Sequence, residues 1–92
     1  MISRDFRISN KLGLHARPSA HLTQVAGRFT SEVFIAKNGR RVNAKSIMGV
    51  MMLAAGPGST VTVDAEGPDE QQAIDAIGEL ISSGFGEAAE SR

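Results

Sequence analysis

A histidine and an arginine stand two positions apart where a helix is about to begin. In the segment GLHARPSAHL, the pattern places the first helical residue at Ala16, so that His15 takes the N-cap position. Pro18 fits the first turn, because an N–H group there has no acceptor inside the helix. A helix N-terminus attracts anions, Arg17 adds a guanidinium that matches phosphate oxygens, and a neutral imidazole can act as a nucleophile. The residues therefore favour a histidine that accepts a phosphoryl group.

Other interpretations of this histidine stay open from the residues alone. A histidine at a helix start is often an indifferent cap with no chemistry. A metal site shared by His15 and His21 is disfavoured, because residues six apart do not share a helix face and no third ligand stands nearby. The carboxylates are scattered and give no Ser-His-Asp order. We therefore expect neither a metal ion nor a cofactor.

A second candidate site lies in KSIMGVMMLAAGPGS, which predicts a short helix. Ser46 suits the N-cap position, since its hydroxyl can accept a hydrogen bond from a first-turn N–H group. Val50 and Leu53 are assigned to the core. So short a helix cannot also bury its other large apolar residues, which are Ile47, Met48, Met51 and Met52. Part of this helix should therefore be exposed, although periodicity does not say which methionine turns inward.

The elements that position these residues alternate between strand and helix patterns. Residues 2–9 alternate as a half-buried strand, and residues 16–29 repeat at helical spacing, with Leu22, Val25, Ala26 and Phe29 as the buried stripe. Asn38-Gly39 predicts a two-residue hairpin within residues 32–43. Residues 59–67 form the clearest strand. An amphipathic helix follows, with Asp69 as N-cap, Gln72 as a possible capping-box partner, Gly84 as the C-terminal glycine, and Ile74, Ile77, Leu80 and Ile81 as its core face.

This order, β-α-β-β-α-β-α, predicts one α+β domain over residues 1–92. The sheet has four strands, and at least the hairpin pair is antiparallel. The simplest packing places all three helices on one face of the sheet and leaves the other face wet. The residues Thr60, Thr62 and Asp64 are assigned to that wet face.

Composition excludes several classes of protein. Ten Lys and Arg balance ten Asp and Glu, and the four aromatic residues are all Phe, so a nucleic-acid-binding surface is not indicated. The absence of cysteine rules out disulfides and thiolate metal sites. No secretory signal and no apolar run long enough to span a bilayer is present. We expect a cytoplasmic monomer that does not insert into membranes.

The motif GLHARP, followed about thirty residues later by KSIMGVM, resembles the HPr family of the bacterial phosphoenolpyruvate-dependent phosphotransferase system. The resemblance implies an open-faced β-sandwich with three helices on a four-stranded antiparallel sheet. It implies that His15 is phosphorylated on its δ1 nitrogen by phosphorylated enzyme I and passes the group to enzyme IIA, with Arg17 at the phosphate site. Such a protein is a carrier and not an enzyme.

The resemblance extends to Ser46, which matches a serine that HPr kinase/phosphorylase modifies in many bacteria. It also implies a docking patch for partners, made of Ala20, Gln24, Ile47, Met48 and Met51. Two alternatives to a sugar-transport carrier stay open. LISSGFGE is similar to the nitrogen-related branch, which signals without sugar import, and phospho-Ser46 could instead create a corepressor docking face.

Overall fold

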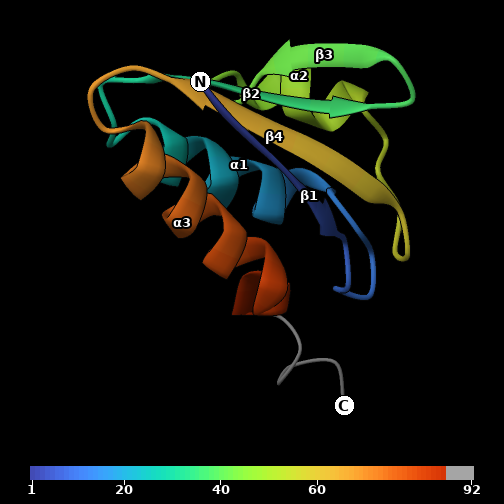
Figure 1. Cartoon of the computed structure of the whole chain (residues 1–92). Helices are drawn as coiled ribbons and strands as arrows, with labels where there is room; N and C mark the ends of the chain where they lie inside the picture. Colours follow the sequence, from blue (N-terminus) through green and yellow to red (C-terminus); the bar gives the residue numbers. More distant parts are fainter. Residues whose placement is uncertain (87–92) are drawn as a thin grey trace.

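The computed structural model describes residues 1–86 and shows a four-stranded antiparallel sheet. The strands lie in the order β1-β4-β2-β3, so the N-terminal strand occupies one edge and β3 the other (Figure 1). Their bounds are β1 Ile2–Arg7, β2 Glu32–Lys37, β3 Arg40–Asn43 and β4 Thr60–Glu66. The antiparallel sheet implied by the family resemblance is confirmed for all neighbouring pairs.

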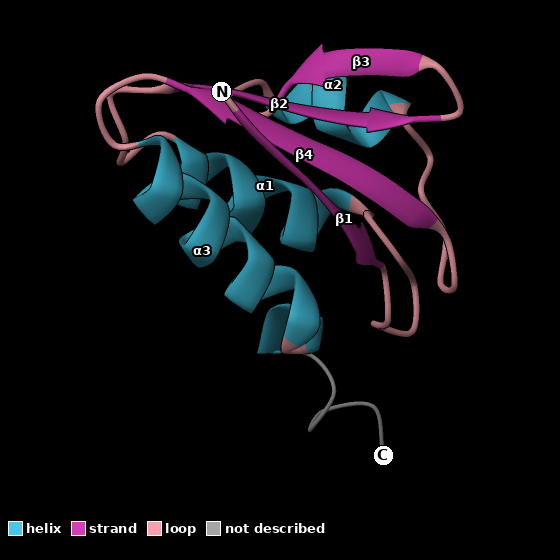
Figure 2. Ribbon diagram, in the orientation of Figure 1, coloured by secondary structure: helices cyan, strands magenta, loops and turns pink. Residues whose placement is uncertain are grey.

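Three α-helices cover one face of this sheet, as expected (Figure 2). They are α1 Ala16–Ala26, α2 Ile47–Met52 and α3 Glu70–Ser82, and a single turn of 3-10 helix, Gly84–Gly86, follows α3. α1 and α3 lie side by side, and α2 packs between α1 and β3. Because α2 packs against α1, the two candidate sites of the sequence lie on neighbouring helices.

The core lies between the helices and the covered face of the sheet. The helical stripes predicted from periodicity are buried, with Phe29 and Leu80 only partly so. Strand β4 supplies its alternate residues to the same core. The largest fully buried apolar side chains include Ile8, Leu22, Ile35, Val50, Ile74, Ile77 and Ile81.

The predicted Asn38-Gly39 hairpin is confirmed. Both residues have positive φ angles, 53° for Asn38 and 83° for Gly39. This backbone matches the right-handed twist of the two strands it joins. Gly84 likewise has the left-handed conformation expected just after a helix, with φ 69°.

Helix α1 is shorter than expected. The sequence pattern extends it to residue 29, but it ends at Ala26, with Gly27 as C-cap. The N–H groups of Arg28 and Phe29 donate to carbonyls three residues back, which tightens the chain into turns. Glycine is a poor helix former, and here it marks the end of the helix.

The open face of the sheet is less wet than predicted. Thr60 is exposed, but Asp64 is only 7% exposed. Arg41, on β3, covers it: the guanidinium donates two hydrogen bonds to the Asp64 carboxylate, at 2.7 and 3.2 Å. The same guanidinium lies 3.8 Å from the centre of the Phe34 ring. The hydrogen bond to Asp64 is the main cause that raises the pKa of Arg41.

Asp69 occupies the N-cap position of α3, but its side chain does not cap the helix. The carboxylate instead accepts hydrogen bonds from the Ser31 hydroxyl and from the backbone N–H groups of Thr30 and Ser31, in the loop after α1. These hydrogen bonds lower the pKa of Asp69, and the bond from the Ser31 hydroxyl has the largest effect. No capping-box hydrogen bond from Gln72 is found within residues 1–86; Glu70 reaches back to the N–H of Gly67 instead. Asp69 therefore joins two loops that sequence patterns treat separately.

Candidate functional site

His15 stands at the N-terminus of α1, in the position predicted for it. Its backbone is extended, with φ −80° and ψ −169°, and its side chain makes no capping hydrogen bond. Helical geometry begins at Ala16, and the N–H of Ser19 closes the first turn on the carbonyl of His15 at 3.0 Å. The His15 side chain is half-buried, while Arg17 is exposed. An imidazole held beside the positive end of a helix dipole is placed to meet an anion.

Pro18 and Ser19 stiffen the first turn of α1 from the side that faces the core. Both are buried against the core side of α1. Pro18 brings a fixed φ and no N–H group, which suits a first turn. The Ser19 hydroxyl donates to the Leu14 carbonyl at 3.1 Å, so the helix is tied to the residue that precedes the histidine.

The loop that delivers His15 is held by its own backbone. The buried Asn10 side chain donates to the Gly13 carbonyl at 2.7 Å, and the N–H of His15 donates to the same oxygen at 3.0 Å. Leu14 donates its N–H to the carbonyl of Ala55, which follows α2, at 2.8 Å. The position of His15 thus depends on hydrogen bonds within the loop that precedes it and on one to the segment that follows α2.

Ser46 caps α2 as predicted. Its hydroxyl oxygen accepts a hydrogen bond from the N–H of Gly49 at 3.2 Å, and the residue is exposed. Val50 and Leu53 point into the core, as expected. All three methionines of α2 stay outside: Met48 is 66%, Met52 61% and Met51 39% exposed. No methionine of this helix turns inward, which settles what periodicity left open.

The residues of the expected docking patch come from two helices that pack together. Ile47, Met48 and Met51 are exposed on α2, and on α1 Gln24 is exposed and Ala20 half-buried. An apolar, methionine-rich surface therefore lies on the helix that packs against the one carrying His15 and Arg17.

Three residues near this surface escaped the sequence analysis. Leu12, three positions before His15, is a large exposed apolar side chain in the loop between β1 and α1. Lys37 and Arg40, from the β2–β3 hairpin, donate to the carbonyls of Ala54 and Met52 at 3.2 and 3.4 Å. They place two cations at the negative end of α2. The sequence did offer a signal for Leu12, since it is an apolar residue inside a loop. It offered no signal for Lys37 and Arg40, because their contacts with α2 depend on tertiary packing.

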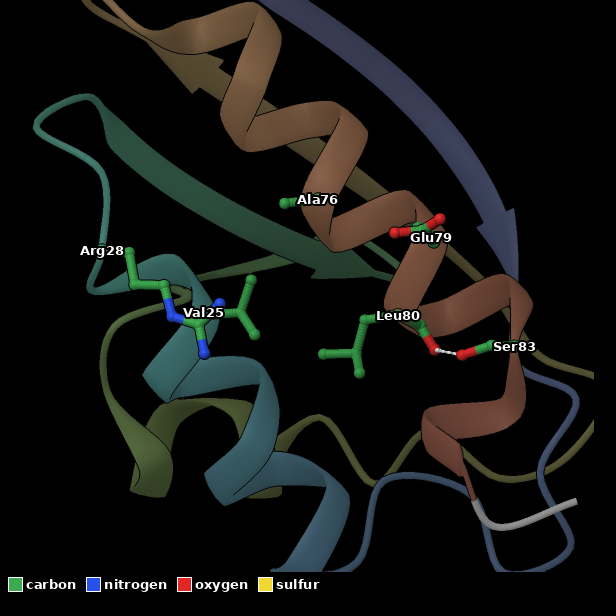
Figure 3. Close-up of a pocket in the computed structure, with 6 residues that line it drawn as sticks. All are labelled: Val25, Arg28, Ala76, Glu79, Leu80 and Ser83. Atoms are coloured by element: carbon green, nitrogen blue, oxygen red, sulfur yellow. Dashed lines mark hydrogen bonds between the residues drawn. The ribbon is translucent and has the colours of Figure 1, made fainter. Parts of the chain in front are cut away.

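An open groove between α1 and α3 is separate from this site (Figure 3). It is lined by Val25 and Arg28 of the end of α1 and its following turn, and by Ala76, Glu79, Leu80 and Ser83 on and just after α3. Val25 lies ten residues beyond His15, or about 15 Å along the helix at 1.5 Å per residue. Within the described residues no group of three or more potential metal ligands is found, and no helix is long and apolar enough to cross a membrane.

Comparison with known proteins defines the class. Residues 2–83 match the family model described as the phosphorylation site of the PTS HPr component. The fold and this match place the chain among the small phosphocarrier domains of the phosphotransferase system. The chain belongs to the HPr family.

This chain aligns with similar proteins over nearly their whole lengths. The phosphocarrier protein HPr of Cupriavidus necator is 66% identical over 87 residues, which are 95% of this chain and 98% of that protein. The HPr-like protein Crh of Halalkalibacterium halodurans is 54% identical, covering 84% and 92%. A crystal structure of HPr from Thermoanaerobacter tengcongensis superposes with a TM-score of 0.91 at 48% identity, covering 94% and 97%.

Proposed function

We propose that His15 carries the phosphoryl group, accepting it from phosphorylated enzyme I and giving it to a histidine of an enzyme IIA domain. The observation that carries this proposal is the half-buried imidazole at the N-cap of α1, with Arg17 in the first turn, in a chain of a phosphocarrier family. In this role the protein is a substrate and a donor for other proteins, and not an enzyme. It needs no cofactor and no metal ion.

The transfer balances without any further reactant. The lone pair of a neutral imidazole nitrogen of His15, δ1 by family resemblance, attacks phosphorus as the donor's phosphorus–nitrogen bond breaks. The donor imidazole leaves with that electron pair, and no water enters. Because charge is spread over the three phosphoryl oxygens during transfer, the helix N-terminus and the Arg17 guanidinium stabilise it. The second transfer, to enzyme IIA, is the same step in reverse roles.

The docking patch fits a protein that must engage several partners in turn. We propose that Ala20, Gln24, Ile47, Met48 and Met51 contact both enzyme I and enzyme IIA. Methionine side chains are flexible and adapt to surfaces of different shape. A carrier must also release each partner quickly, which small interfaces allow. We expect it to work in the cytoplasm and as a monomer. Sedimentation of the purified protein would check its oligomeric state.

Labelling with phosphoenolpyruvate and enzyme I tests the carrier role. The wild-type protein should take up a phosphate that is labile in acid and stable in base. The His15→Ala variant should take up none, and Arg17→Ala should do so much more slowly. His21→Ala is the matched control: His21 is the chain's other histidine and lies exposed on the same helix, and its loss should leave labelling intact. Labelling that survives His15→Ala would overturn the proposal.

We also propose that Ser46 is a regulatory phosphorylation site for an HPr kinase/phosphorylase. Its hydroxyl is exposed and already sits at the positive end of α2, where a phosphate is favourable. Added negative charge beside the docking patch would repel an acidic partner surface. Incubation with the kinase and ATP should give an acid-stable mark that is absent in Ser46→Ala.

A second candidate function is a regulatory module, either in the nitrogen-related branch or as a phospho-Ser46 corepressor. The similarity to the HPr-like protein Crh and the exposure of Ser46 favour it. Adding an enzyme IIA domain to the labelling experiment separates a carrier from a purely regulatory module. A carrier passes its phosphate on to enzyme IIA, whereas a purely regulatory module keeps its function when His15 is replaced by alanine.

A further inference from the structure

The methionines of this chain are distributed unevenly over its surface. Of four, Met48, Met51 and Met52 lie exposed on the six-residue helix α2. The fourth, Met1, is 69% exposed but immediately precedes β1, which lies at the opposite edge of the sheet from β3, against which α2 packs. The chain has no cysteine, tryptophan or tyrosine. Its thioethers are therefore its most readily oxidised side chains, and three of the four are gathered on one surface.

We propose that Met48, Met51 and Met52, the α2 methionines, form a reversible oxidation site whose sulfoxides weaken partner docking. This inference rests on the proposed function, because it assigns a regulation to the same surface. The reactant is a peroxide. Oxygen is transferred from hydrogen peroxide to the thioether sulfur, the O–O bond breaks, a sulfur–oxygen bond forms, and water leaves. The sulfur is oxidised by two electrons, and methionine sulfoxide reductases reverse the change.

The packing of α2 confines the effect to the surface. The helix is anchored by Val50 and Leu53, which are buried, and by the Ser46 hydrogen bond at its start. None of these groups is a thioether. Oxidation of the exposed methionines should therefore leave the core and the fold in place.

Docking is affected because it requires Met48 and Met51, the two α2 methionines of the proposed docking patch, to lose water. A thioether is apolar and flexible, and burying it in an interface is favourable. A sulfoxide is polar, and burying it without a hydrogen-bond partner costs free energy. Sulfoxides at Met48 and Met51, with a third beside them at Met52, should therefore act together on every partner that uses the patch.

The experiment uses the full chain with and without hydrogen peroxide. Peptide mass spectrometry should find sulfoxide at the α2 methionines, and near-identical circular dichroism should show an intact fold. Phosphorylation by enzyme I, at enzyme I concentrations below saturation, should be about tenfold slower after oxidation, equivalent to about 1.4 kcal/mol of docking. Treatment with methionine sulfoxide reductases should restore the initial rate.

A variant with Met48→Leu, Met51→Leu and Met52→Leu isolates the site. It retains Met1 as its one oxidisable thioether, so peroxide should leave its phosphorylation rate at the untreated value of the same variant. An equal slowing of this variant, or an unchanged rate in the fully oxidised wild-type protein, would overturn the inference. If the untreated wild-type protein takes no phosphate, the proposed function itself fails and with it the docking consequence, while peptide mapping still decides where oxidation occurs.

Discussion

The backbone N–H of Leu14 donates a hydrogen bond to the carbonyl oxygen of Ala55, 2.8 Å away. Leu14 immediately precedes His15, and Ala55 follows the end of α2. The bond therefore joins the loop that carries the histidine to the segment that ends the apolar helix. This main-chain contact links the position of His15 to that of α2, which carries part of the proposed docking patch.

Replacing Gly13 should break this junction. Gly13 has φ 68°, and a Cβ built there would lie 2.3 Å from the Ala55 carbonyl oxygen. Gly13→Ala should therefore lower the free energy of unfolding by about 3 kcal/mol or more, from backbone strain and steric overlap together. It should also slow phosphorylation of His15, because the loop must move.

Gly39→Ala is the matched control for Gly13→Ala. Gly39 has φ 83°, but nothing lies within 4 Å of its added Cβ. It should lose only about 1–2 kcal/mol, the cost of the left-handed conformation. Urea denaturation of both variants measures the difference, and equal losses would show that the contact to Ala55 contributes nothing.

Asp69 should make stability depend on pH in the acid range. Hydrogen bonds from Ser31 and Thr30 lower its pKa in the folded protein. Its contribution is therefore fully present above the ordinary aspartate pKa of about 4, and is lost as the pH falls through the lower folded value. Asp69→Asn should be less stable than wild type at neutral pH and should show a shallower loss of stability in acid.

The control for Asp69 is Asp75→Asn, on the same helix. Asp75 is exposed; within residues 1–86 it accepts a hydrogen bond from its helix neighbour Gln71, and Arg4 lies 3.6 Å away. Thermal denaturation at a series of pH values should give this variant the wild-type acid slope. An Asp69→Asn slope as steep as that of wild type would remove Asp69 as the cause.

Asp64 and Asp69 also show where local patterns stop. Strand alternation correctly directs Asp64 away from the core, and helix-start statistics correctly place Asp69 at an N-cap. Their partners, however, lie 23 and 38 residues away in the chain. A pattern of neighbours carries no information on such contacts, so one carboxylate was expected to be wet and the other to cap a helix.

The candidate site likewise combines features that short segments predict with features that depend on tertiary packing. The N-cap positions of His15 and Ser46 follow from short segments, because capping is a local property of the chain. The contact of Leu14 with Ala55, and of Lys37 and Arg40 with the end of α2, requires the packed sheet and helices. The exposure of all the α2 methionines depends on how deeply Val50 and Leu53 are buried in the core. Periodicity alone does not determine that depth.

Arg41 should be a structural residue despite its exposed position. It covers Asp64 with two hydrogen bonds and stacks on Phe34. Arg41→Ala leaves a nearly buried carboxylate without its cation, and Arg41→Lys keeps the charge but loses the two-bond geometry. The midpoint of urea denaturation should fall most for alanine and less for lysine. Arg4→Ala, which removes an exposed pair with Asp75, should hardly change it, and a loss as large as that of Arg41→Ala would contradict this view.

Two substitutions at Ser46 should separate its capping role from the effect of charge. Ser46→Ala removes the acceptor for the Gly49 N–H and should cost about 1 kcal/mol of unfolding free energy. Ser46→Asp keeps an acceptor and adds negative charge at the positive end of α2, so it should be at least as stable as wild type. If charge beside the patch inhibits docking, Ser46→Asp should be phosphorylated by enzyme I more slowly than wild type, while the less stable Ser46→Ala keeps the wild-type rate. Denaturation curves and initial labelling rates measured on the same preparations give both quantities, and inhibition that follows stability instead of charge would reject an electrostatic mechanism.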